Sequence, residues 1–191
     1  KYNLLTEFGR IIQAVQPSVV SMENVPNLIH ENVFRDFVRT LNELHYEVEY
    51  QVVNCPDYGV PQHRKRLVLL ASRFGEIHLI PPLYDAAHYI TVRDAIGHLQ
   101  PIEAGEICPD DILHRSSALS AINMERIQQS VPGGTWRDWD ENLRLKCHRK
   151  ESGATFPSVY GRMEWDEPSP TMTTQFYGYG NGRFGHPEQN R

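Results

Sequence analysis

Cysteine is scarce in this sequence, and long apolar runs are absent. The three cysteines, at positions 55, 108 and 147, are an odd number without paired spacing. That pattern is typical of reduced intracellular thiols and not of a disulfide framework. No apolar run approaches the length that crosses a membrane, and no signal peptide is recognisable. We therefore expect a cytoplasmic protein without membrane contact.

An excess of positive charge is also absent. The sequence contains 19 Lys and Arg and 24 Asp and Glu, which gives a formal net charge of −5. A broadly basic nucleic-acid coat is thereby excluded, so any anionic partner has to be met by local basic clusters. The histidines are scattered without the spacing of metal ligands or of a zinc-type pairing with cysteine. The sequence therefore predicts no metal site.

Apolar residues dominate five segments of the first half of the chain. They recur at helical spacing in residues 4–15 and 33–44, and they run together or alternate in residues 18–25, 46–52 and 67–71. The order helix, strand, helix, strand, strand predicts the latter half of a wound α/β sheet. Because the sequence does not begin with Met, we also expect it to be a piece of a longer protein.

The second half of the chain has a different composition. Beyond residue 85 the sequence is rich in Gly, Pro and Thr with little periodicity, apart from short helices expected in residues 92–99 and 117–129. We expect a partial catalytic α/β domain in residues 1–85 and a small irregular, mostly β lobe in residues 86–175. Residues 176–191 are expected to return toward the first domain.

The first chemical cluster stands at the end of the apolar run Ser18–Val25. The run has no polar alternation, which predicts a strand covered on both faces, as in a parallel sheet. Glu23 would then lie at the carboxyl end of the strand, where ligands collect in open α/β sheets. The alternative is that Glu23 and Asn24 simply open a solvated turn.

The second chemical cluster is Gln62-His63-Arg64-Lys65-Arg66, between a proline turn and a buried strand. Strand alternation predicts that Gln62, Arg64 and Arg66 point to the same side. Guanidinium groups are fixed forks for carbonyl oxygens or phosphates, so such a row suits an oxygen-rich or anionic ligand. The alternative is a solvated strand entry whose charges guard an apolar edge.

The two clusters together resemble the DNA cytosine-5 methyltransferase family, in which a Glu-Asn-Val motif and a Gln-x-Arg-x-Arg motif occur in this order. The matching segments here are Glu23–Val25 and Asp57–Arg66. Downstream, Arg126–Trp136 is similar to the start of the family's variable region, Tyr160–Thr174 to its ninth motif and His186–Arg191 to the approach to its tenth. The resemblance covers nearly the whole chain.

The resemblance implies a Rossmann-like methyltransferase sheet followed by a target-recognition lobe. In the family a cysteine thiolate adds to carbon 6 of a flipped cytosine, and carbon 5 then takes the methyl group of S-adenosylmethionine. Glu23 matches the acid that engages ring N3, which would favour a carboxyl pKa raised by burial. Arg64 and Arg66 match the pair that faces the base, and Asn24 and Gln62 would support the site.

The resemblance also implies a double-stranded DNA partner and a monomeric bacterial enzyme, and it leaves membership of a restriction-modification system open. Short basic segments can lie along phosphates, whereas a solvated charge run is the alternative. The candidate DNA contacts are Arg144, Lys146, Arg149, Lys150 and Thr173.

Two family elements are missing from these 191 residues. The Pro-Cys dipeptide of the nucleophile does not occur, and neither does the Gly-rich cofactor loop. Cys55 lies after the Glu motif and is expected to be a small apolar residue. We therefore expect the isolated chain to be inactive and to bind S-adenosylmethionine weakly or not at all. A tRNA cytosine-5 methyltransferase of the same fold and a non-catalytic DNA-binding module stay open as alternatives.

Overall fold

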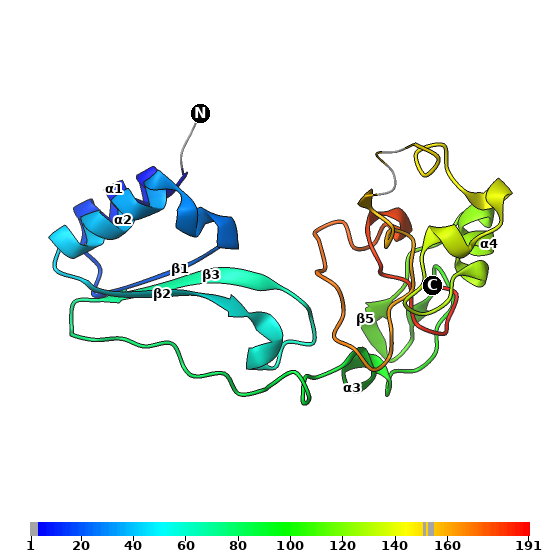
Figure 1. Ribbon diagram of the computed structural model, residues 1–191. Helices are drawn as coiled ribbons and strands as arrows, with labels where there is room; N and C mark the ends of the chain where they lie inside the picture. The colour runs from blue at the N-terminus through cyan, green and yellow to red at the C-terminus, as the bar shows by residue number, and fades with distance from the viewer. Residues whose placement is uncertain (1–3, 151, 153–154) are drawn as a thin grey trace. The chain divides into compact units, whose positions relative to one another are not determined.

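The computed structural model of the protein describes residues 4–150, 152 and 155–191. The chain forms two compact units (Figure 1). The first unit comprises Lys1–Tyr58 and Arg64–Ala86, and the second comprises Gly59–His63 and Ala87–Arg191. None of the helices in the described ranges is long and apolar enough to cross a membrane.

Two helices and three strands make up the first unit. Helices α1 (Leu4–Val15) and α2 (Asn32–Glu43) form where the helical periodicity predicts them, and both lie on the same side of the sheet (Figure 1). The side chains buried between these helices and the strands form one continuous core. Its largest fully buried members are Phe34, Ile12, Leu41, Leu67 and Leu69.

The sheet consists of β1 (Val19–Asn24), β2 (Glu47–Asn54) and β3 (Lys65–Ser72), in the order β1-β3-β2. Both β1 and β2 pair antiparallel with β3, so they run in the same direction with β3 reversed between them. The prediction that β1 is covered on both faces of a parallel sheet is therefore wrong. Only alternate residues of this strand, Val20 and Met22, are buried, because both helices cover the same face.

The strand register decides which side chains share a face. Glu23 lies opposite Val68 on β3, and Arg66 lies two positions before Val68 on the same strand. Leu67 and Leu69 alternate with these residues and are fully buried against the helices. Because side chains alternate along a strand, Glu23 and Arg66 both project from the face opposite the helices.

The second unit has little regular structure, as predicted for an irregular lobe, but in its described residues it is not mostly β, because its helices α3 and α4 contain more residues than its two strands. It contains α3 (Val92–Ile96), β4 (Ile107–Cys108), β5 (Asp111–Arg115) and α4 (Ala121–Gln129), joined by turns and short 3₁₀ segments. Strands β4 and β5 form an antiparallel pair. Both predicted helices of this lobe are present and are shorter than predicted. The return of residues 176–191 toward the first unit stays a prediction.

Aromatic side chains form a core in the second unit. Trp136 and Trp139 are buried, and His148 stacks on Trp136 with ring centroids 4.4 Å apart. Burial, reinforced by Arg126 and Arg144, lowers the pKa of His148. This histidine, which the sequence places inside a basic run, is therefore a core residue.

Arg162 connects distant parts of the second unit. Its side chain is buried, and its guanidinium donates hydrogen bonds to the end of α4 and to the C-terminal residues. Because burial disfavours the charged form, the pKa of Arg162 is lowered. The acceptors are the carbonyl oxygens of Ile127, Ser130, His186 and Gln189 and the side-chain oxygen of Asn190.

Candidate active site

An acid and a guanidinium meet on the open face of the first unit's sheet. The Arg66 Nε atom lies 2.5 Å from Glu23 Oε1, and Arg66 also donates to the carbonyl of Lys65 at 2.8 Å. The Arg66 side chain is 19% exposed and that of Glu23 is 60% exposed. A charged donor and a charged acceptor are therefore presented together, with the carboxylate accessible to a ligand.

The end of β1 positions this pair. Asn24 is the last residue of the strand, and its Oδ1 accepts a hydrogen bond from the Val25 amide at 2.8 Å. The chain then turns into a 3₁₀ segment, Pro26–His30. The burial expected for the Glu23 carboxyl is absent in this chain, because the open face of the sheet leaves this side chain in solvent.

The prediction that Gln62, Arg64 and Arg66 point to the same side assumes that all three belong to one strand, and this assumption is wrong. Regular strand structure begins only at Lys65, so strand alternation does not extend back to Gln62. Gln62 instead forms an isolated parallel bridge with Ser169, and both belong to the second unit. The half-buried Arg64 accepts a backbone hydrogen bond from Cys55 at 2.8 Å.

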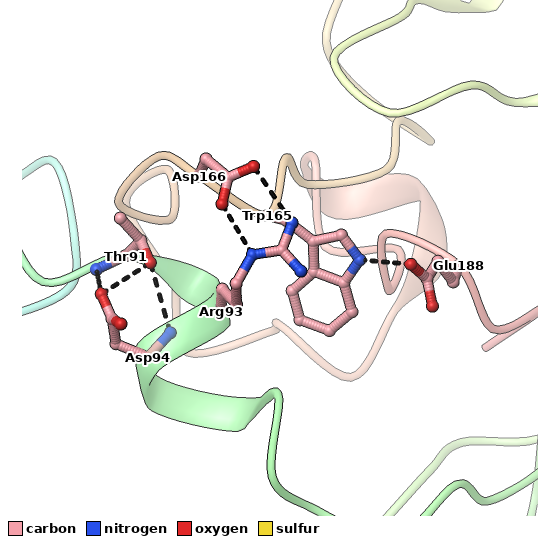
Figure 2. A network of polar contacts seen from close by, with 6 residues as sticks. All are labelled: Thr91, Arg93, Asp94, Trp165, Asp166 and Glu188. Atoms are coloured by element: carbon pink, nitrogen blue, oxygen red, sulfur yellow. Dashed lines mark hydrogen bonds and ion pairs between the residues drawn. The ribbon is translucent and has the colours of Figure 1, made fainter.

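Sequence reasoning missed a polar network in the second unit (Figure 2). Arg93 of α3 forms a two-pronged ion pair with Asp166, at 2.7 and 3.0 Å, and its guanidinium carbon lies 5.3 Å from the centroid of the Trp165 ring. Trp165 donates from Nε1 to Glu188 Oε1 at 2.7 Å. The hydrogen bond from Arg93 lowers the pKa of Asp166. The network fastens α3 to the segment of Trp165 and to the C-terminal residues.

The same network contains a helix cap that the sequence could have revealed. Thr91 accepts from the Asp94 amide, and Asp94 accepts from the Thr91 amide, which is a capping box at the start of α3 (Figure 2). The hydrogen bond from the Thr91 amide is the largest cause that lowers the pKa of Asp94. A threonine three positions before an acid is a recognisable signal for such a cap. No comparable signal links Arg93 to Asp166.

Two of the five candidate DNA contacts already donate hydrogen bonds within the second unit. Arg144 donates to the carbonyls of Arg137 and Trp139, and Arg149 donates to the carbonyl of Glu141, so both guanidinium groups support local structure. The remaining three candidates are exposed: Lys146, Lys150 and Thr173. Within the described ranges, no group of three or more His, Cys, Asp or Glu residues could hold a metal ion.

Comparisons with known proteins place these features in a family context. The family model described as C-5 cytosine-specific DNA methylase matches residues 1–191. The Type II methylase M.HgiDII of Herpetosiphon aurantiacus is 54% identical over 194 residues, which cover 100% of this chain and 55% of the relative. The Type II methyltransferase M1.BsuMI of Bacillus subtilis is 34% identical over 187 residues, which cover 96% of this chain and 42% of the relative.

A solved structure supports the fold. The crystal structure of a putative DNA modification methyltransferase encoded within a prophage (E. coli) matches 96% of this chain and 58% of its own chain, with a TM-score of 0.65 and 18% identity. The antiparallel sheet of the first unit and the irregular lobe are thus consistent with part of a Rossmann-like methyltransferase fold. The chain spans about half the length of the curated relatives named above.

Proposed function

Because this chain belongs to the C-5 cytosine-specific DNA methylase family, we propose that it supplies the acid and the arginine that act on the target base in cytosine-5 methylation of DNA. The observation that carries this proposal is the contact between Glu23 and Arg66 at the carboxyl end of β1. The methyl group would come from S-adenosylmethionine and go to carbon 5 of a cytosine that has left the duplex.

The chemistry requires two groups of this kind. Carbon 5 of cytosine is a poor nucleophile, and addition of a thiolate to carbon 6 makes it reactive while negative charge develops on the ring. A carboxyl group at N3 and a guanidinium at the O2 carbonyl would both stabilise that charge. Glu23 and Arg66 fit these roles because their polar ends point toward the same small region of the open face. On binding, the base would replace the direct contact between them.

The nucleophile and the methyl-donor site are assigned to residues outside these 191 positions. None of the three cysteines follows a proline: Cys55 is half-buried, Cys108 is buried and Cys147 is exposed. The turn after β1 leads into a short 3₁₀ segment without a side-chain cap, which does not fit a Gly-rich nucleotide cradle. The isolated chain is therefore proposed to transfer no methyl group.

A chimera tests the proposal. In it, this chain replaces the matching part of the Herpetosiphon aurantiacus methylase, and transfer of labelled methyl from S-adenosylmethionine to duplex DNA is measured. Glu23→Gln should lower kcat by about 10²- to 10⁴-fold with little change in DNA affinity, because the variant cannot exchange a proton with the ring. Arg66→Lys should also lower kcat, because a lysine does not reproduce the fork of the guanidinium.

The controls are the exposed carboxylate Glu47 of β2 and the surface arginine Arg39 of α2. Glu47→Gln and Arg39→Lys should leave kcat within about twofold. A chimera that methylates DNA equally well with glutamine at position 23 would overturn the role of the acid. Faster methylation of labelled tRNA than of duplex DNA would favour the RNA methyltransferase alternative.

A further inference from the structure

A hollow in the second unit combines aromatic side chains with free positive charge. It has a volume of about 740 Å³, and all its lining residues belong to the second unit. Six of these residues define what is here termed the aromatic hollow: Leu113, Arg115, Met172, Phe176, Tyr177 and Arg191. Its size and largely apolar lining are within the range of ligand sites in proteins.

The aromatic side of the hollow is presented by an anchored loop. Tyr179 is buried, lies 3.3 Å from Ser130 Oγ through its hydroxyl and contacts Tyr160 edge-on. Just before this anchor, Phe176 and Tyr177 are 60% and 63% exposed. The loop that carries them is closed by its own backbone hydrogen bonds. Two aromatic rings are thus held in solvent by a fixed backbone, which reduces the conformational entropy lost when a ligand stacks on them.

The charge of the hollow is positive. Arg115, at the end of β5, is exposed, and its guanidinium has no partner in the part of the chain that the structure describes. Arg191 is half-buried and already contacts Gln189. Burial lowers the pKa of His186 to about 4, so this histidine is neutral at neutral pH. None of the described lining residues is acidic.

Phe176 and Tyr177 lie edge to face, with ring centroids 6.2 Å apart and an interplanar angle of 74°. We propose that the aromatic hollow is a nucleotide-binding site, in which Phe176 stacks on an unpaired DNA base, Tyr177 contacts the edge of that base and Arg115 binds the adjoining phosphate. Every nucleobase has an apolar face that stacks on aromatic rings, and guanidinium groups suit phosphate oxygens. The exposed Leu113, which also lines the hollow, would add an apolar contact to the base. This assignment rests on the proposed function, because it takes DNA as the ligand.

Binding of labelled DNA to the 191-residue chain tests the site. The probes are a fluorescein-labelled 24-base-pair duplex and the same duplex with one unpaired adenine, and fluorescence anisotropy gives the Kd of each. The native chain should bind the bulged duplex about tenfold more tightly, because its extra base is already unstacked. Phe176→Ala and Tyr177→Ala should each remove this preference. Arg115→Gln should weaken binding of both duplexes and reduce the salt slope by about one.

The matched control is Phe156→Ala, because Phe156 is another exposed phenylalanine of this unit and does not line the hollow. It should keep the preference. Phe176→Leu separates base stacking from apolar docking: loss of the preference supports the nucleotide site, and its retention overturns it in favour of an apolar occupant such as a peptide segment. Equal binding of both duplexes by the native chain also overturns it.

The two proposals fail separately. If the chimera methylates DNA through Glu23 and the Phe176→Ala variant keeps the native preference for the bulged duplex, only the nucleotide site is rejected. If the chain prefers the bulged duplex through Phe176 and the chimera transfers no methyl group, only the proposed function is rejected. Native tryptophan fluorescence verifies that each variant of the second unit is folded, because Trp136, Trp139 and Trp165 all belong to that unit.

Discussion

Replacing Arg162 with methionine should unfold the second unit at much lower denaturant. The substitution leaves the buried carbonyls of Ser130 and His186 without the Arg162 donor, whereas the Ile127 carbonyl keeps its hydrogen bond from the Ser130 amide at 3.1 Å. Each orphaned buried acceptor costs about 1–3 kcal/mol. Part of this loss is offset, because methionine removes the cost of burying a charge, which is the cause of the lowered pKa of Arg162. The expected net loss is about 3 kcal/mol.

Tryptophan fluorescence in urea measures this loss selectively, because all three tryptophans belong to the second unit. With a slope of about 1–2 kcal/mol per molar urea, the midpoint should fall by about 1.5–3 M. The control is Arg149→Met, since Arg149 is exposed and its guanidinium donates a hydrogen bond to the carbonyl of Glu141 at 2.9 Å. It should change stability by about 0.5 kcal/mol or less. An Arg162→Met midpoint that coincides with the native one would refute the reasoning.

Two further predictions concern the second unit. Because the pKa of folded His186 is about 4 and that of an unfolded histidine is about 6.5, the unfolded chain binds more protons between these values, so stability should fall by up to about 3 kcal/mol on acidification from pH 6.5 to pH 4. His186→Asn should make urea midpoints measured over this range less dependent on pH, with His148 accounting for a residual slope in the same direction. Thr91→Ala should lower the free energy of unfolding by about 1 kcal/mol, because the helix cap of α3 is lost. Thr173→Ala is the control at an exposed position and should change it little, and urea titration measures both variants.

The existence of the elements was more predictable than their pairing. The apolar periodicities of α1 and α2 are strong because each helix buries one face, and these predictions are confirmed. The arrangement of the strands could not be predicted, since side-chain alternation reveals a strand and not its neighbour or direction. In β1 the exposed Val19 fills a position where a polar residue would have revealed the open face. The central strand is β3, which is the last of the first unit's three strands along the chain.

The candidate site was predictable to a different degree for each residue. The order of the two motifs brought Glu23 and Arg66 into one hypothesis, and the structure places them in contact. The orientation that strand alternation predicts for Gln62 has no basis in the structure, because the proline turn before this residue keeps the segment out of the strand. The sequence does not reveal that Arg162 is a buried hydrogen-bond donor, because an arginine in a Gly- and Pro-rich stretch resembles a surface residue. Its acceptors lie 24 to 35 positions away along the chain.

The contact between Glu23 and Arg66 is a consequence of the core behind it more than of its own attraction. An ion pair whose carboxylate is 60% exposed contributes at most about 1 kcal/mol, which is too little to fix a strand. Leu67 and Leu69 are fully buried on the other face of β3, and a slip by one residue would move them into solvent and turn Arg66 into the helices. The hydrophobic pattern therefore sets the register, and the register brings the acid and the guanidinium into contact on the open face of the sheet.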